Sequence, residues 1–153
     1  MVELLVVIFI ISLLTGSVFV SYRSGQQRYE ISTSAQQLVA NLRLVQNMAL
    51  SGKKIGSISP AGYGLYSAAD QYLLFYNVDE NTSYAAGSSV IIQSIKLLPS
   101  VSLSPSGNSI YFVPPDPTTY LNDIISGSLT FTLTSGNASK QLTVSSSGLI
   151  ELD

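Results

Sequence analysis

Five consecutive residues with oxygen-bearing side chains, Asp79-Glu80-Asn81-Thr82-Ser83, could hold a hard cation. Calcium loops offer such oxygens at alternating positions of a turn. The run lacks the turn glycine and the distant bidentate glutamate of those loops, so a polar connection between strands is the favoured interpretation. The chain also has no histidine and no cysteine, which removes imidazole and thiolate ligands. The sequence therefore predicts no metal site.

Ser51 and Lys54 have the spacing of a Ser-x-x-Lys nucleophile pair. The companion motifs of the β-lactamase and penicillin-binding group are absent, and a chance match at the end of a helix is the better interpretation. The sequence also has no Gly-x-Ser-x-Gly elbow, phosphate loop or dinucleotide fingerprint. We therefore expect no catalytic residue, no cofactor and no enzymatic activity.

The tyrosines, nine in number, could stack on the bases of single-stranded DNA. Base stacking usually accompanies a basic groove, however, and the formal net charge here is −2. Lys53-Lys54 is the only local basic pair in the sequence. Tyrosines at alternating strand positions are more typical of a sheet surface or core. DNA is therefore a disfavoured partner.

The elements that position these residues begin with an almost wholly apolar run from Leu4 to Val20. A bilayer core is crossed by about 20 apolar residues in a helix, so this run predicts a membrane span. A cleavable signal peptide would start with basic residues and end in a small-residue cleavage site, whereas this run starts with Met1-Val2-Glu3 and leads into a helical pattern. The residues that interrupt it are Ser12, Thr15, Gly16 and Ser17.

A second apolar pattern follows, with steps of three and four residues. Its members are Ile31, Ala35, Leu38, Leu42, Val45 and Ala49. Such steps predict a helix with one apolar stripe. Because no proline occurs before Pro60, one continuous helix from about Val2 to about Leu50 is expected, roughly 70 Å long. Ser51-Gly52 is a suitable C-terminal stop.

After Lys54 the apolar period changes to two, which predicts short strands. The clearest hairpin alternates apolar and Thr residues over 129–133, turns at 135–137 and returns over 142–144. Three prolines within 114–117 predict an irregular loop. The other expected strands are 65–67, 72–77, 90–98, 101–103, 110–113 and 149–150.

Met1-Val2-Glu3-Leu4-Leu5-Val6-Val7-Ile8 resembles the start of a mature bacterial type IV pilin or type II secretion pseudopilin. The resemblance implies that a prepilin peptidase removes a basic leader ending in glycine, that the new N-terminus is methylated, and that Met1 is the third mature residue. A weaker resemblance links the β-rich part to the GspH/FimT-like group of minor pilins and pseudopilins. It rests on Tyr63-Gly64-Leu65-Tyr66, Leu74-Phe75-Tyr76-Asn77 and Gly148-Leu149-Ile150.

Site residues follow from the resemblance. It implies that Glu3 of an incoming subunit pairs with the N-terminal amine of a neighbour in the filament, where an unmatched charge in a low-dielectric core is costly. Without that role, Glu3 would be an idle acid at the headgroup interface. The stretch Thr15-Gly16-Ser17 is a candidate for helix melting on assembly. The expected helix-bundle core contains Leu4, Leu5, Val6, Val7 and Ile8.

The resemblance implies a pilin fold of the α+β class, with a long N-terminal helix, apolar in its first half, packed on an antiparallel β-sheet domain. Residues 1–53 are expected to form the membrane-spanning and filament-core helix, and residues 54–153 the extracytoplasmic β-rich domain. The predicted function is a structural subunit of a type IV pilus. A type II secretion pseudopilin, and a single-span membrane-anchored binding domain that does not polymerise, are the alternatives.

The same resemblance implies the partners and the location. Expected partners are identical or related pilin subunits in a helical polymer, the prepilin peptidase and the pilus assembly machinery. The subunit is expected in the inner membrane of a bacterium before assembly and in a cell-surface filament afterwards.

Overall fold

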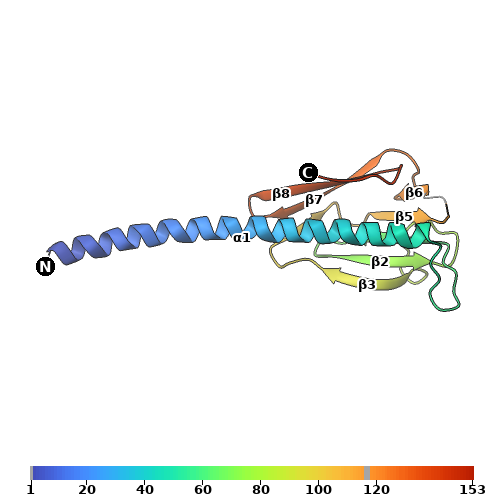
Figure 1. Cartoon of the computed structure of the whole chain (residues 1–153), viewed down its shortest axis with the longest axis horizontal. Coiled ribbons are helices and arrows are strands. Elements are labelled where there is room, and N and C mark those ends of the chain that lie inside the picture. The colour runs from blue at the N-terminus through green and yellow to red at the C-terminus, as the bar shows by residue number, and fades with distance from the viewer. Residues whose placement is uncertain (1, 116–117) are drawn as a thin grey trace.

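The computed structural model describes the backbone of residues 2–115 and 118–153, and their side chains except those of residues 16–21. In this part of the chain one helix, α1 (Val2–Leu50), is followed by nine strands. Figure 1 shows the N-terminal part of α1 projecting alone from a body formed by its second half and the strands. The α+β class is thus confirmed, and the helix is continuous as the uninterrupted, proline-free sequence predicts.

The strands form two antiparallel sheets, which agrees with the predicted antiparallel β-sheet domain and adds a division that the sequence did not indicate. The five-stranded sheet has the order β3-β2-β1-β5-β6, and the four-stranded sheet has the order β4-β7-β8-β9. The first contains β1 (Gly62–Ser67), β2 (Gln71–Asn77), β3 (Val90–Lys96), β5 (Ser109–Val113) and β6 (Thr118–Leu121). The second contains β4 (Ser102–Ser104), β7 (Ser128–Ser135), β8 (Ala138–Ser145) and β9 (Ile150–Leu152).

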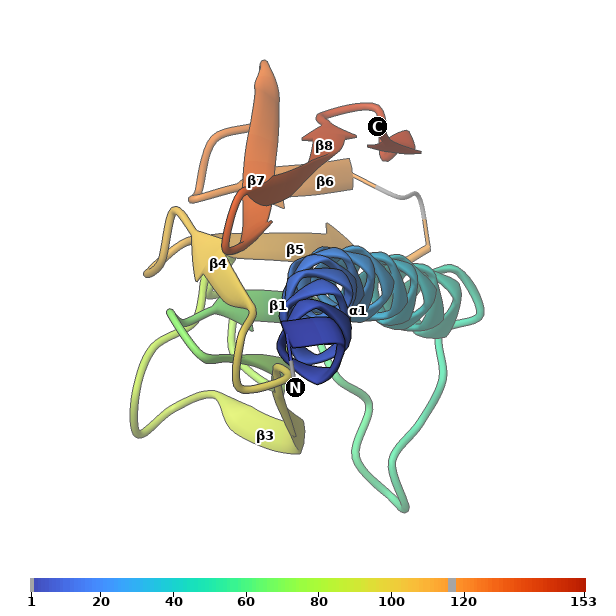
Figure 2. The ribbon, with the colours of Figure 1, turned by 90° about the vertical axis from the view of Figure 1, so that its left-hand side faces the viewer.

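The second half of α1 packs against both sheets, as the end-on view in Figure 2 shows. All six members of the predicted stripe are buried, each exposing at most 2% of its surface. They meet inward-facing strand residues such as Leu65 of β1, Phe131 of β7 and Leu142 of β8 in one core. The stripe therefore holds the helix on the sheets, because only this packing shields its apolar side chains from water.

The helix ends where the sequence predicts. Gly52 adopts a left-handed φ of 54°, which glycine takes without strain. The Lys53 amide donates to the Met48 carbonyl oxygen at 3.0 Å, and the Ser51 hydroxyl donates to the same oxygen at 3.2 Å. Ser51 thus serves the helix terminus, which supports the interpretation of its spacing from Lys54 as a chance match.

One strand was missed by the sequence analysis. The segment expected as an irregular proline loop is followed directly by β6, which pairs with β5. Thr119 and Leu121 of β6 face the core while Thr118 and Tyr120 face outward, so the alternation is present but spans only four residues. The prolines before β6 indicated a loop, so this additional edge strand of the five-stranded sheet was not predicted.

Candidate functional site

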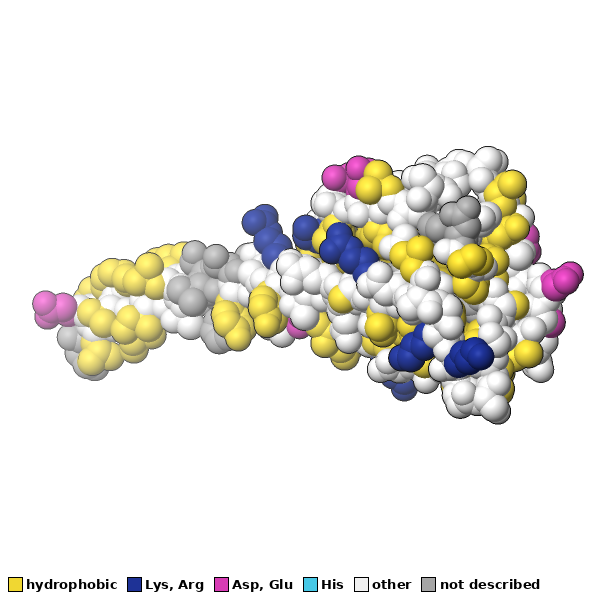
Figure 3. All heavy atoms as spheres, turned by 45° about the vertical axis from the view of Figure 1, so that its right-hand side comes forward, with side chains coloured by type: hydrophobic (Ala, Val, Ile, Leu, Met, Phe, Trp, Pro, Cys, Tyr) yellow, Lys and Arg dark blue, Asp and Glu magenta, His cyan; other side chains and the backbone are white. Residues whose placement is uncertain are grey.

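Residues 2–14, at the tip of the projecting part of α1, expose apolar side chains on every side, interrupted by Glu3 and Ser12. From Val2 to Leu14 its large apolar side chains expose between 49% and 76% of their surface. Figure 3 shows hydrophobic side chains covering much of the visible face of the helix near its N-terminal end. A helix that is hydrophobic all round is normally buried, and a patch of this extent on a monomer marks an interaction surface. The predicted assembly residues Leu4, Leu5, Val6, Val7 and Ile8 all belong to it.

Glu3 is the acidic residue of the first turn of α1 and is exposed. An acidic side chain is favourable there because the unpaired amides of a helix N-terminus carry partial positive charge. Met1 lies outside the described residues. The predicted partner of Glu3, an amine of a neighbouring subunit, stays a prediction.

The predicted melting stretch is helical in this structure. The Thr15 hydroxyl donates to the Ile11 carbonyl oxygen at 2.7 Å, and the Ser12 hydroxyl donates to the Ile8 carbonyl oxygen at 2.8 Å. The side chains of Gly16 and Ser17 lie outside the described residues. Within the part of the chain that is described, no helix meets the length and hydropathy required to cross a membrane.

A second candidate site lies on the outer face of the five-stranded sheet, away from α1. Loop 78–89, between β2 and β3, crosses this face, and Tyr84 of the loop stacks on Tyr66 of β1 with ring centroids 4.4 Å apart. The Tyr84 ring also meets Phe75 of β2 edge-on, with centroids 5.3 Å apart. The loop is therefore packed on the sheet as a strap.

Hydrogen bonds hold residues 81–83 of the strap from two sides. The Asn77 side-chain amide donates to the carbonyl oxygens of Asn81 and Ser83 at 2.7 and 3.0 Å. On the far side, the Thr82 hydroxyl donates to an Asp123 carboxylate oxygen at 2.7 Å. The predicted oxygen-rich run is thus a rigid turn anchored to the loop that follows β6.

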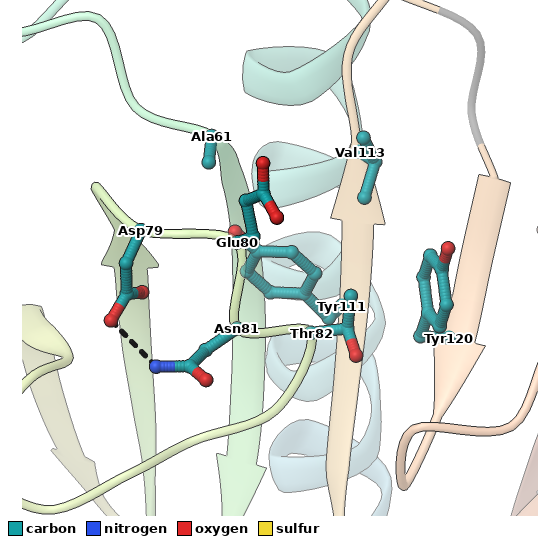
Figure 4. A pocket seen from close by; sticks show the side chains of 8 residues that line it. All are labelled: Ala61, Asp79, Glu80, Asn81, Thr82, Tyr111, Val113 and Tyr120. Carbon is teal, nitrogen blue, oxygen red and sulfur yellow. Dashed lines mark hydrogen bonds between the residues drawn. The ribbon is translucent and has the colours of Figure 1, made fainter.

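Between the strap and the sheet is a hollow of about 320 Å³. Figure 4 shows the strap residues on one side and the β5 and β6 side chains on the other. Among the described residues lining it, two are carboxylates and none is basic. The lining consists of Ala61, Asp79, Glu80, Asn81, Thr82, Tyr111, Val113 and Tyr120.

Tyr111 forms the floor of this hollow and exposes only 1% of its surface. Its hydroxyl is buried without a hydrogen-bond partner. Burial, and secondarily the negative charge of Asp79, raise the pKa of Tyr111 far above its usual range, so the phenol stays protonated. The hydroxyl is therefore an unused polar group beneath two carboxylates.

No third acidic side chain of the described residues joins Asp79 and Glu80 of the oxygen-rich run. Asp79 accepts a hydrogen bond from the Asn81 amide at 2.6 Å, as Figure 4 shows. Among the described residues, no group of three or more acidic side chains is close enough to hold a metal ion. The sequence alone did not predict Tyr111 and Tyr120 as partners of this run. The alternating strand pattern places both on the outer face, but only the strap's course brings them to Asp79 and Glu80.

A protein-family model described as GspH, type II transport protein GspH, matches residues 34–148. The chain belongs to the GspH family. The match covers most of the packed part of α1 and all strands from β1 to β8, and it confirms the resemblance to the pilin and pseudopilin superfamily. Comparisons with curated proteins and with solved structures found no match.

Membership in the GspH family changes the balance between the predicted functions. The description of the family names type II transport and supports a pseudopilin role in type II secretion. A type IV pilus subunit, the function that the sequence alone favoured, is related but receives no specific support from it.

Proposed function

We propose that this GspH-family protein is a structural subunit of a type II secretion pseudopilus, assembled through the projecting half of α1. The observation that carries the proposal is the apolar surface that residues 2–14 expose on all sides, on a chain whose other elements already share a complete core. Nothing in the described body covers the projecting segment, so another apolar environment must do so. Residues 1–53 then form the assembly element and residues 54–153 the extracytoplasmic domain.

Two environments would cover this segment in succession. The inner membrane would hold it before assembly, and the helices of related subunits would hold it afterwards. Each buried apolar square ångström contributes about 25 cal/mol relative to water, so a segment of this kind is not left in solution. Glu3 would then pair with the N-terminal amine of a neighbour and set the axial position of each new subunit. Such a role is structural, with no catalytic step.

A type IV pilus subunit is the second candidate, because the first eight residues resemble both classes equally. Both functions use the same assembly chemistry, so cellular readouts must separate them. Loss of the gene should abolish export of a secreted enzyme from the periplasm while leaving surface pili intact. Loss of pili with normal export would favour the pilus, and loss of neither would favour an anchored domain that does not polymerise.

The assembly mechanism is tested by Glu3→Gln, which keeps the size of the side chain and removes its charge. Leaving one member of a buried ion pair unmatched costs about 3–5 kcal/mol, so filament growth should fall more than tenfold while membrane levels of the subunit stay normal. Glu151→Gln, which neutralises an exposed acid on β9, is the matched control and should assemble normally. Normal filament yield from Glu3→Gln would contradict an assembly role for Glu3.

A further inference from the structure

Two buried oxygen atoms near the strap are unpaired: one belongs to an amide and can only accept a hydrogen bond, and the other belongs to a phenol and can accept or donate one. The Tyr111 hydroxyl and the Asn77 side-chain oxygen are both buried and have no partner. Ionised Asp79 and Glu80 can only accept hydrogen bonds. Buried polar groups in native proteins are nearly always paired, so the unpaired Tyr111 hydroxyl in the lining of the hollow points to a polar ligand there, and the two carboxylates beside it favour a ligand that carries hydrogen-bond donors.

The hollow has the size and walls for one side chain rather than for a cofactor. Its volume of 320 Å³ lies at the lower end of small-ligand pockets, which span about 300–1,000 Å³. Val113 and Ala61 provide apolar walls, and the half-buried Tyr120 ring provides an aromatic wall. Such a ring attracts a cation placed over its face. An aliphatic stem ending in an N–H-bearing cation matches all of these features.

A metal ion matches them less well. Asp79 is already committed to the Asn81 amide, and the described residues offer no third acidic ligand. A calcium ion needs about six to eight oxygen ligands, whereas a guanidinium brings several donors to acceptors that need not surround it.

We propose that the hollow between the strap and β5–β6 binds an arginine or lysine side chain presented by a neighbouring protein subunit. Glu80 and Asp79 supply the opposing charge, Tyr120 packs on the cation, and the Tyr111 hydroxyl accepts a hydrogen bond from it. That the cation is presented by a neighbouring subunit rests on the proposed assembly function. That the ligand carries a positive charge, N–H donors and a narrow stem rests on the hollow alone.

The test titrates the detergent-solubilised full chain with the peptide acetyl-Gly-Arg-Gly-amide and follows backbone amide NMR shifts. Acetyl-Gly-citrulline-Gly-amide, which keeps the shape but lacks the charge, is the control peptide. We expect saturable shifts at residues 79–82, 111 and 120 with the arginine peptide, and at least tenfold weaker binding of the citrulline peptide. Equal binding of the two peptides, or no saturable binding of the arginine peptide, would overturn the proposal.

Variants separate a binding role from a structural one. Glu80→Gln should weaken arginine-peptide binding at least fivefold, whereas Glu151→Gln should leave it unchanged. Tyr111→Phe should also weaken binding without lowering the melting temperature of the free protein, since it removes a buried hydroxyl that has no partner. Unchanged peptide binding by Tyr111→Phe would remove that hydroxyl from the site and contradict the proposed geometry.

Two further titrations identify the source of the cation. Calcium that shifts the same resonances while the arginine peptide does not would replace the proposal by a metal site. Putrescine, a free diamine, binding ten times more tightly than the peptide would assign the hollow to a small metabolite. Glu3→Gln protein should bind the peptide normally, so a failure of filament assembly and a failure of this site give different results.

Discussion

At the scale of single residues, Gly62 of β1 shows how closely the outer face of the five-stranded sheet is packed. A Cβ atom at this position would lie 2.6 Å from the Phe112 carbonyl oxygen and from two ring atoms of Tyr111. The glycine thus lets the Tyr111 ring cross β1 and reach the strap. Its role depends on a contact between strands far apart in the sequence, which is why the sequence alone did not reveal it.

Gly62→Ala should therefore destabilise the protein. Because one of the atoms in the way belongs to the backbone, the sheet must shift, and overpacking of this kind costs about 1–3 kcal/mol. Thermal unfolding followed by circular dichroism measures the loss. The matched control is Gly25→Ala in α1, where no atom outside the local helix lies within 4 Å of the new methyl group. That change should gain up to about 1 kcal/mol through helix propensity, and a gain at Gly62 would contradict the packing argument.

The oxygen-rich run gives a second prediction at this scale. Added calcium should not raise the melting temperature, because Asp79 is bonded to the Asn81 amide and no third acidic ligand stands beside Glu80 among the described residues. A site with a Kd one hundredth of the added calcium concentration would add about 2.7 kcal/mol of stability. A calcium-dependent rise that disappears in Asp79→Ala would show that the turn rearranges to hold the ion.

At the scale of elements, the apolar periodicity of the sequence predicted the long, regular helix and strands. The stripe from Ile31 to Ala49 and the alternation within β7 and β8 identify core positions, because both patterns fix which side chains can face one partner surface. Periodicity did not predict that the strands divide into two sheets, nor that loop 78–89 folds back over one of them. Those features depend on contacts such as Tyr66 with Tyr84, which no local pattern encodes.

The middle of α1 is joined to the strands by a carboxylate that makes stability depend on pH. Glu30 accepts hydrogen bonds from the Ser100 hydroxyl and the Gln26 amide, and these two bonds, Ser100 first, lower its pKa. A lowered pKa in the folded state stabilises the protein above the unfolded value, near 4.5, and that stability is lost as the pH falls through the folded value.

Ser100→Ala should therefore reduce stability at neutral pH and flatten its decline as the pH falls below the unfolded value, near 4.5. Melting temperatures above and below that pH measure the effect. Ser106→Ala, at an exposed loop position, is the control and should keep the wild-type profile. An unchanged acid profile in Ser100→Ala would show that the Glu30 bond contributes nothing to folding.

The projecting half of α1 is expected to change on assembly. In the free subunit, the Ser12 and Thr15 hydroxyls bond carbonyl oxygens one turn earlier in an intact helix. The same hydroxyls could satisfy carbonyls released by a broken ladder, and Gly16 costs about 1 kcal/mol relative to alanine in a helix. Irregular backbone within a membrane-spanning segment is tolerated when other protein segments bury it, and a bundle of subunits would do so.

We therefore expect the helix to lose regularity around residues 12–17 in the filament while it stays intact in the free subunit. A filament map at a resolution that shows backbone carbonyls measures this directly. Because the segment contains no proline, an unbroken helix is the alternative result. Continuous hydrogen bonds between residues four apart, from Leu4 through Val20, would refute the expectation.

At the scale of the whole molecule, the protein joins two halves with opposite requirements. The body completes its own core with the packed part of α1, whereas residues 2–14 of the projecting part expose mainly apolar surface. At 1.5 Å per residue, the 25 residues before Gln27 extend roughly 37 Å from the body. The exposed apolar surface is thus concentrated at one end of the molecule, and the body stays free to make weaker contacts such as the proposed cation site.

A chain truncated to begin at Gln26 should then be soluble and monomeric. The buried stripe starts at Ile31, and the bond between Gln26 and Glu30 is kept, so the truncation removes no side chain of the core. Light scattering after gel filtration should give the mass of one chain, and circular dichroism should show strands beside one helix. The control is a chain beginning at Asn41, which loses Ile31, Ala35 and Leu38 from the core and should fail to fold, since each large apolar side chain removed costs about 2–5 kcal/mol. If the chain from Gln26 instead associates as the full chain does, the projecting helix is not the surface that drives assembly; a mostly helical spectrum would contradict the two-sheet body itself.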